Sequence, residues 1–95
     1  YTVINASKAN IAPNTEVTVA GKCCESGDLI QENCNIATPE KGDILCVLST
    51  GAYNYSMASN YNRNPRPAMI MIKDTKPRIV IKRESYEDLI KNDIK

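Results

Sequence analysis

The segment with the most chemical potential is Lys-Cys-Cys-Glu-Ser-Gly-Asp at residues 22–28, which places the thiol of Cys24 directly before the carboxylate of Glu25. A thiol can act as a nucleophile or a proton donor, and a carboxylate can bind a cation. The charge of Glu25 disfavours ionisation of the adjacent thiol and so favours proton donation. The structural alternative is that residues 26–28 form an ordinary turn and Cys24 simply packs. Composition alone favours this alternative.

A second polar cluster spans residues 51–62 and contains three Tyr, three Asn and two Ser. So many hydroxyl and amide groups could bind a phosphate or another polar ligand. The alternative is a polar surface loop anchored by its Tyr rings. Basic residues follow between Arg63 and Arg83, but acidic residues interrupt them and few aromatic residues are interleaved. They favour a solvated strand face over a nucleic-acid-binding patch.

The composition limits the classes of partner and site. Lys and Arg number 12 and Asp and Glu 11, a net charge of +1, which argues against nucleic acid or an anionic membrane as a partner. There is no His and no Cys-x-x-Cys pair, so we expect no metal site. Cys23 and Cys24 are adjacent, and their Cα atoms, about 3.8 Å apart, are too close for a usual disulfide. This spacing indicates reduced thiols and a cytoplasmic protein.

Short runs of β-branched and apolar residues predict strands at 1–6, 16–20, 68–73 and 78–84, and one starting at 29–30. The nearly continuous apolar run 43–50 predicts a strand buried on both faces. We expect a short helical turn near 53–59 and a short C-terminal helix near 86–92, the latter opened by a capping box from Ser85 to Asp88. These elements predict a mainly β fold, a small antiparallel β-barrel or sandwich.

The two polar clusters together resemble one family. The block Ala-Gly-Lys-Cys-Cys-Glu-Ser-Gly-Asp at 20–28, followed by Gly-Ala-Tyr at 51–53, Ser-Asn-Tyr-Asn at 59–62 and Arg-Pro-Ala at 66–68, is similar to the C-terminal part of the diaminopimelate decarboxylase family. The ending Arg-Glu-Ser-Tyr-Glu-Asp-Leu at 83–89 also resembles that family, so the similarity covers essentially the whole chain. The resemblance makes the functional interpretation of both clusters the favoured one.

The resemblance implies a role for three residues of a pyridoxal-phosphate enzyme of the alanine-racemase-like class. Cys24 matches the cysteine that such enzymes supply across a dimer interface as proton donor. Glu25 matches a glutamate that binds the substrate. Tyr53 matches a tyrosine that contacts both the substrate and the cofactor phosphate. A neutral thiol, a carboxylate facing an ammonium group and a phenol facing a phosphate are suited to these tasks.

The resemblance also implies that residues 1–95 are the C-terminal β domain of a larger homodimeric enzyme that converts meso-diaminopimelate to L-lysine and CO2. The chain begins at Tyr1, and we expect an excised segment that is inactive alone. The lysine that holds the cofactor would lie outside it, in an N-terminal β/α barrel. Two alternatives stay open: a decarboxylase of another basic amino acid in the same family, and a small β-barrel module that binds nucleic acid.

Overall fold

The computed structural model describes residues 1–94, whose strands pair into three two-stranded antiparallel sheets. They divide into two compact units, Tyr1–Ser56 and the residues from Met57 onward. The first unit contains the sheet of β1 (Val3–Asn5) with β4 (Leu45–Val47) and the hairpin of β2 (Thr15–Ala20) with β3 (Leu29–Ile36). The second contains the hairpin of β5 (Met69–Lys73) and β6 (Lys76–Ile81). The mainly β expectation is therefore confirmed, but the sheets of residues 1–94 are not joined into a closed barrel.

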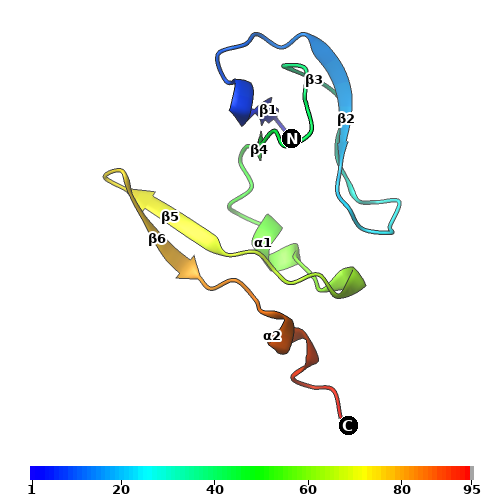
Figure 1. The fold of residues 1–95 in the computed structure, drawn as a ribbon, viewed down its shortest axis with the longest axis vertical. Coiled ribbons are helices and arrows are strands. Elements are labelled where there is room, and N and C mark those ends of the chain that lie inside the picture. Colours follow the sequence, from blue (N-terminus) through cyan, green and yellow to red (C-terminus); the bar gives the residue numbers. More distant parts are fainter. Residues whose placement is uncertain (95) are drawn as a thin grey trace. The chain divides into compact units, whose positions relative to one another are not determined.

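The hairpin of β2 and β3 is the longest pairing in the first unit and ends in the loop 21–28 (Figure 1). Along β2, Val17 and Val19 are half-buried while Glu16 and Thr18 are exposed, as the period-two alternation predicts. β3 is less regular, because the register of its pairing shifts opposite the stretch from Val17 to Val19 of β2. Asn33 adopts a left-handed φ of 51° there, a conformation that Asn tolerates better than most residues.

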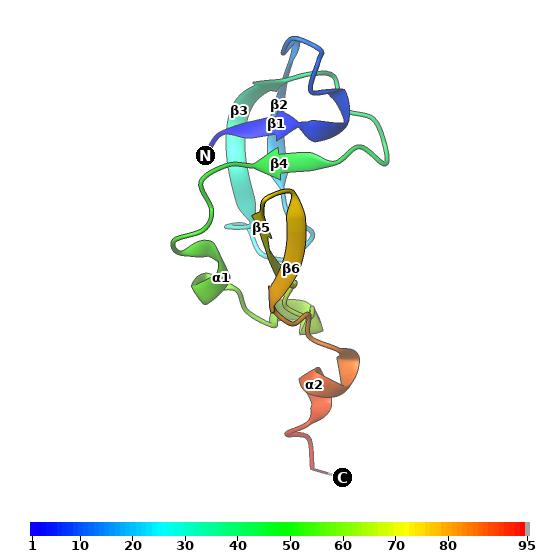
Figure 2. The same ribbon diagram turned by 90° about the vertical axis from the view of Figure 1, so that its left-hand side faces the viewer.

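The core of the first unit lies where β1, which runs beside β4 in Figure 2, contacts β3. Val3, Ile36 and Ala37 are its buried apolar residues, and Ile36 is only 1% exposed. The side chain of Asn5 is also buried and donates from Nδ2 to the carbonyl of Ala37 at 3.3 Å. The β2–β3 hairpin is joined to this small core through Ile36, the last residue of β3.

Asp43 fastens the turn before β4 to β1 and to the 3-10 helix η1 (Ala6–Lys8). Its Oδ2 accepts from Asn5 Nδ2 and from the backbone N–H of Glu40, each at 2.9 Å, and Lys8 Nζ lies 3.3 Å away. These donors favour the carboxylate, and the Asn5 bond above all holds the pKa of Asp43 below its ordinary value of 3.8. Desolvation acts to lower the pKa of Lys8, but its hydrogen bonds to Glu40 and Asp43 outweigh this and raise it.

The expectation of a doubly buried strand over residues 43–50 is wrong. Only Leu45–Val47 form a strand, all three half-buried, and Ile44 is 68% exposed. The backbone of Ile44 instead bonds to η1, donating to Ser7 Oγ at 2.8 Å and accepting from the N–H of Ala6 at 2.8 Å. Ser49 then turns the chain with a left-handed φ of 59°. An apolar run indicates a preference for burial, but the bonds of Ile44 to η1 precede the strand and the turn at Ser49 follows it, so only three residues pair as a strand.

In the second unit, the β5–β6 hairpin closes through a two-residue turn at Asp74 and Thr75, whose φ angles are 50° and 62°. Positive φ at both turn residues is typical of the type I′ turn that suits the twist of a hairpin.

The helical turn expected near 53–59 is α1 (Asn54–Met57), and the expected C-terminal helix is α2 (Tyr86–Ile90). The capping box before α2 is confirmed: Ser85 Oγ accepts from the N–H of Asp88, and Asp88 Oδ2 accepts from the N–H of Ser85 at 2.8 Å.

Candidate functional site

Cys24 and Glu25 lie in the loop 21–28, between the last residue of β2 and the first residue of β3. Both are exposed. The neck of the loop is closed by a hydrogen bond from the N–H of Gly21 to the carbonyl of Asp28 at 2.9 Å. The two strands therefore hold the ends of the loop together and present its central residues to solvent. This placement leaves the thiol and the carboxylate accessible to a ligand, as the functional interpretation requires.

The side chain of Asp28 fills the inside of this loop. Its Oδ2 accepts from the backbone N–H of Cys23 at 2.8 Å, and its own N–H donates to the carbonyl of Glu25 at 3.1 Å. Gly21 leaves room for the carboxylate, because a Cβ built on Gly21 would overlap it. Sequence reasoning treated Ser26-Gly27-Asp28 as turn chemistry only and missed this role. The signal was a Gly and an Asp at the two ends of the loop.

The carboxylate of Glu25 lies over Gly27. A Cβ built on Gly27 would stand 2.6 Å from Glu25 Oε2, closer than an ordinary van der Waals contact. The missing side chain of Gly27 therefore creates the space that this conformation of Glu25 occupies. The Ser-Gly step thus has a direct steric consequence for the candidate substrate-binding residue.

Tyr53 lies on a different segment of the first unit, in the turn that precedes α1. Its side chain is 72% exposed. The turn is fixed by a hydrogen bond from Ser56 Oγ to the carbonyl of Tyr53 at 2.8 Å, and Asn54 Nδ2 lies 3.4 Å from the hydroxyl of Tyr1. The structure thus brings Cys24 and Glu25 together in one loop and presents Tyr53 separately, with its ring and phenol exposed.

Asn60 of the second polar cluster takes part in a hydrogen-bond network within the second unit. Asn60 Nδ2 and the backbone N–H of Arg66 both donate to Glu84 Oε2 at 2.6 Å, and Arg66 Nη1 lies 3.0 Å from Glu84 Oε1. The bond from the Arg66 backbone, followed by that from Asn60, lowers the pKa of Glu84. Arg63 also pairs with Asp93 at 3.1 Å. Arg63 and Arg66 are thus paired with carboxylates and lie outside the strands.

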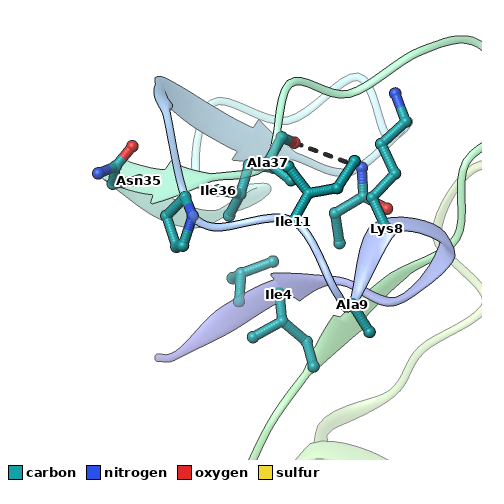
Figure 3. Close-up of a pocket in the computed structure, with 10 residues that line it drawn as sticks. Ile4, Lys8, Ala9, Ile11, Asn35, Ile36 and Ala37 are labelled. Atoms are coloured by element: carbon teal, nitrogen blue, oxygen red, sulfur yellow. Dashed lines mark hydrogen bonds between the residues drawn. The ribbon is translucent and has the colours of Figure 1, made fainter.

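The pocket found in the first unit lies apart from the candidate residues. A pocket of about 170 Å³ lies between η1, β1 and the end of β3, with Ile4, Ile11 and Ile36 among its lining residues (Figure 3). It is smaller than the roughly 300–1,000 Å³ of typical ligand sites and contains none of the candidate residues. Asn5 Oδ1 is buried there without a hydrogen-bond partner in the described part of the chain, and the cavity has room for a water molecule. Over residues 1–94, no cluster of three or more His, Cys, Asp or Glu side chains is arranged to hold a metal ion.

No helix within residues 1–94 is long and apolar enough to cross a membrane. Residues 1–51 match the protein family described as "Pyridoxal-dependent decarboxylase, C-terminal sheet domain". That match covers more than half of the chain. The chain belongs to this family.

Individual relatives extend the similarity to nearly the whole chain. It is 45% identical over 94 residues to the diaminopimelate decarboxylase of Bacillus subtilis (strain 168), covering 99% of this chain and 21% of that protein. It is 51% identical over 87 residues to that of Staphylococcus aureus (strain COL), covering 90% and 21%. A crystal structure of diaminopimelate decarboxylase from M. jannaschii in co-complex with L-lysine matches with a TM-score of 0.86 and 35% identity, over 99% of this chain and 21% of that one.

These comparisons confirm the resemblance to diaminopimelate decarboxylases that the two sequence clusters indicated. The chain spans about a fifth of the length of the relatives it matches.

Proposed function

We propose that this chain is the C-terminal domain of a diaminopimelate decarboxylase, which converts meso-diaminopimelate to L-lysine and CO2. One observation carries the proposal: 45–51% identity to diaminopimelate decarboxylases over almost the whole chain. The exposed Cys24–Glu25 loop supports it, because the two side chains that would meet a substrate are presented together. In this proposal the segment is inactive alone, since no lysine in it is assigned to hold the cofactor.

Cys24 is the proton donor of the proposed site. After CO2 leaves, the reacting carbon must receive a proton, and a positioned neutral thiol can supply it. The exposure of Cys24 at the end of a hairpin allows its sulfur to enter a pocket formed by another part of the protein. Glu25 lies beside it and offers a carboxylate to the second ammonium group of the substrate, an interaction that is short and favourable in a desolvated pocket.

Tyr53 fits a role in holding pyridoxal phosphate. Its phenol is a hydrogen-bond donor suited to a phosphate oxygen, its ring can wall the pocket, and its exposure leaves both accessible. When bound, pyridoxal phosphate supplies an electron sink for the carbon that loses its carboxylate. The residues of this chain would then bind the substrate ammonium at Glu25, hold the phosphate at Tyr53 and deliver the proton from Cys24.

The complete enzyme is a homodimer in this proposal, with active sites at the interface. The β5–β6 hairpin supports a larger assembly, because apolar side chains of both strands are exposed, among them Ile70 at 57%, Ile72 at 71% and Ile79 at 67%. Exposed apolar surface of this kind marks a contact with further protein. We also include in the proposal that the three sheets are completed into a closed antiparallel barrel or sandwich in the full protein. We also propose a cytoplasmic location for the complete protein, because the spacing of the cysteines indicates reduced thiols.

The test uses the complete protein, assayed with meso-diaminopimelate and pyridoxal phosphate by following CO2 and lysine. Cys24→Ala should reduce turnover by about a hundredfold or more while leaving the cofactor absorbance intact, because general acid catalysis typically contributes 10²–10⁴-fold. Cys23→Ala is the matched control and should be mild. Assays of the same protein with other basic amino acids test the alternative that one of these is its substrate. Wild-type turnover in Cys24→Ala, or faster turnover of another basic amino acid, would contradict the proposal.

A further inference from the structure

Asp28 makes hydrogen bonds to the backbone on both sides of Cys24. Its carboxylate accepts from the N–H of Cys23, and its own N–H donates to the carbonyl of Glu25. Its carbonyl also accepts from the N–H of Gly21. Three polar groups of one half-buried residue therefore fix the loop before the thiol, after it and at the neck.

Gly21 and Asp28 form a matched pair at the neck of the loop. Any side chain at residue 21 would occupy the space of the Asp28 carboxylate, as the overlap with a built Cβ shows. The φ of Gly21 lies outside the left-handed region, so its backbone conformation is open to other residues. What a larger residue would disturb at this position is the placement of the carboxylate.

We propose that Asp28 is a positioning residue that fixes the loop so that the thiol of Cys24 and the carboxylate of Glu25 meet the same substrate. This inference rests on the proposed function, because it assigns Cys24 and Glu25 to the reaction. Asp28 acts through the backbone and does not itself touch the substrate. Its contribution follows from geometry, since a misplacement of about 1 Å can cost on the order of a hundredfold in rate.

Two substitutions at Asp28 test whether its hydrogen-bond acceptor fixes the loop. Asp28→Ala removes the acceptor for the Cys23 N–H, and we expect kcat for meso-diaminopimelate to fall by about tenfold or more in the complete enzyme. Asp28→Asn keeps an oxygen acceptor of the same length and should restore most of kcat, with some loss because neutral hydrogen bonds are weaker than charged ones. Asp74→Asn, at the exposed turn of the other hairpin, is the control for removing one carboxylate.

Gly21→Ala perturbs the same contact from the other side. Its Cβ should displace the carboxylate of Asp28 and so reproduce the loss of kcat seen in Asp28→Ala. The double variant should be no worse than either single variant, because both remove one interaction.

Hydrogen exchange of the peptide that contains residues 21–28 gives a readout independent of activity. Exchange should accelerate in Asp28→Ala and Gly21→Ala and stay close to wild type in Asp28→Asn. Additive losses in the double variant, equal losses in Asp28→Ala and Asp28→Asn, or unchanged exchange in Asp28→Ala would overturn the inference. If the wild-type protein does not act on meso-diaminopimelate, the proposed function fails, while the exchange data still decide whether Asp28 fixes the loop.

Discussion

Replacing Gly27 with alanine should displace the carboxylate of Glu25 without unfolding the loop that carries it. The new Cβ would stand 2.6 Å from Glu25 Oε2, whereas ordinary contact begins at 3.4 Å. The carboxylate must therefore retreat by about 0.8 Å, a shift comparable to the 1 Å misplacement that can cost on the order of a hundredfold. Because the clash is with the end of a flexible side chain, the stability should change by less than about 0.5 kcal/mol.

The effect on catalysis is bounded by the strength of the interaction that Glu25 makes with the substrate. A hydrogen bond to a charged group contributes about 1.5–3 kcal/mol, so complete loss of this interaction in Glu25→Ala should raise KM by roughly 10- to 150-fold. Gly27→Ala, which shifts the carboxylate but keeps it, should raise KM by about tenfold, with kcat little changed because substrate binding is what is lost. The assay is steady-state decarboxylation of meso-diaminopimelate by the complete enzyme.

A KM for Gly27→Ala equal to that of the wild-type enzyme would refute the argument that Gly27 sets the position of Glu25. A large fall in kcat at constant KM would show that the loop affects the proton donor more than substrate binding.

Three further predictions concern stability in the complete protein. Ile36→Ala should cost about 2–5 kcal/mol, because Ile36 is 1% exposed in the core, and hydrogen exchange over residues 1–56 should accelerate; protection equal to wild type would contradict this. Ser85→Ala should cost about 0.5–2 kcal/mol by removing the cap of α2, measured as faster exchange of the Asp88 amide. The lowered pKa of Asp43 means that its stabilisation is complete above its ordinary value of 3.8 and is lost as the pH falls through the lower folded-state pKa. Asp43→Asn should remove this acid-dependent part of the unfolding free energy, and an unchanged pH profile below 3.8 would argue against it.

The sequence was sufficient for features that depend on neighbours in the chain. The capping box from Ser85 to Asp88 and the alternation of β2 were both predicted, because each involves residues within a few positions of one another. The adjacency of Cys24 and Glu25 is likewise a property of the chain itself. For the same reason, the resemblance drawn from the two polar clusters already indicated the family.

Contacts between distant residues could not be predicted from the sequence. The apolar run 43–50 gave no sign that the backbone of Ile44 bonds to Ser7, 37 residues away, and that the strand is shortened to three residues. The sequence left two interpretations for the cluster that contains Asn60. Only the folded structure shows that Asn60 donates a hydrogen bond to Glu84, 24 residues later. Each of these outcomes depends on which donor reaches which acceptor after folding.

The loop 21–28 shows the division most clearly. The sequence by itself determined that a thiol and a carboxylate stand side by side, and that Gly and Asp flank them. Only the pairing of β2 with β3 brought residue 21 against residue 28, so that a missing side chain makes room for a carboxylate that holds the backbone at Cys23. The physical reason is that composition sets which groups are available, while the paired strands set the distances at which these groups can bond.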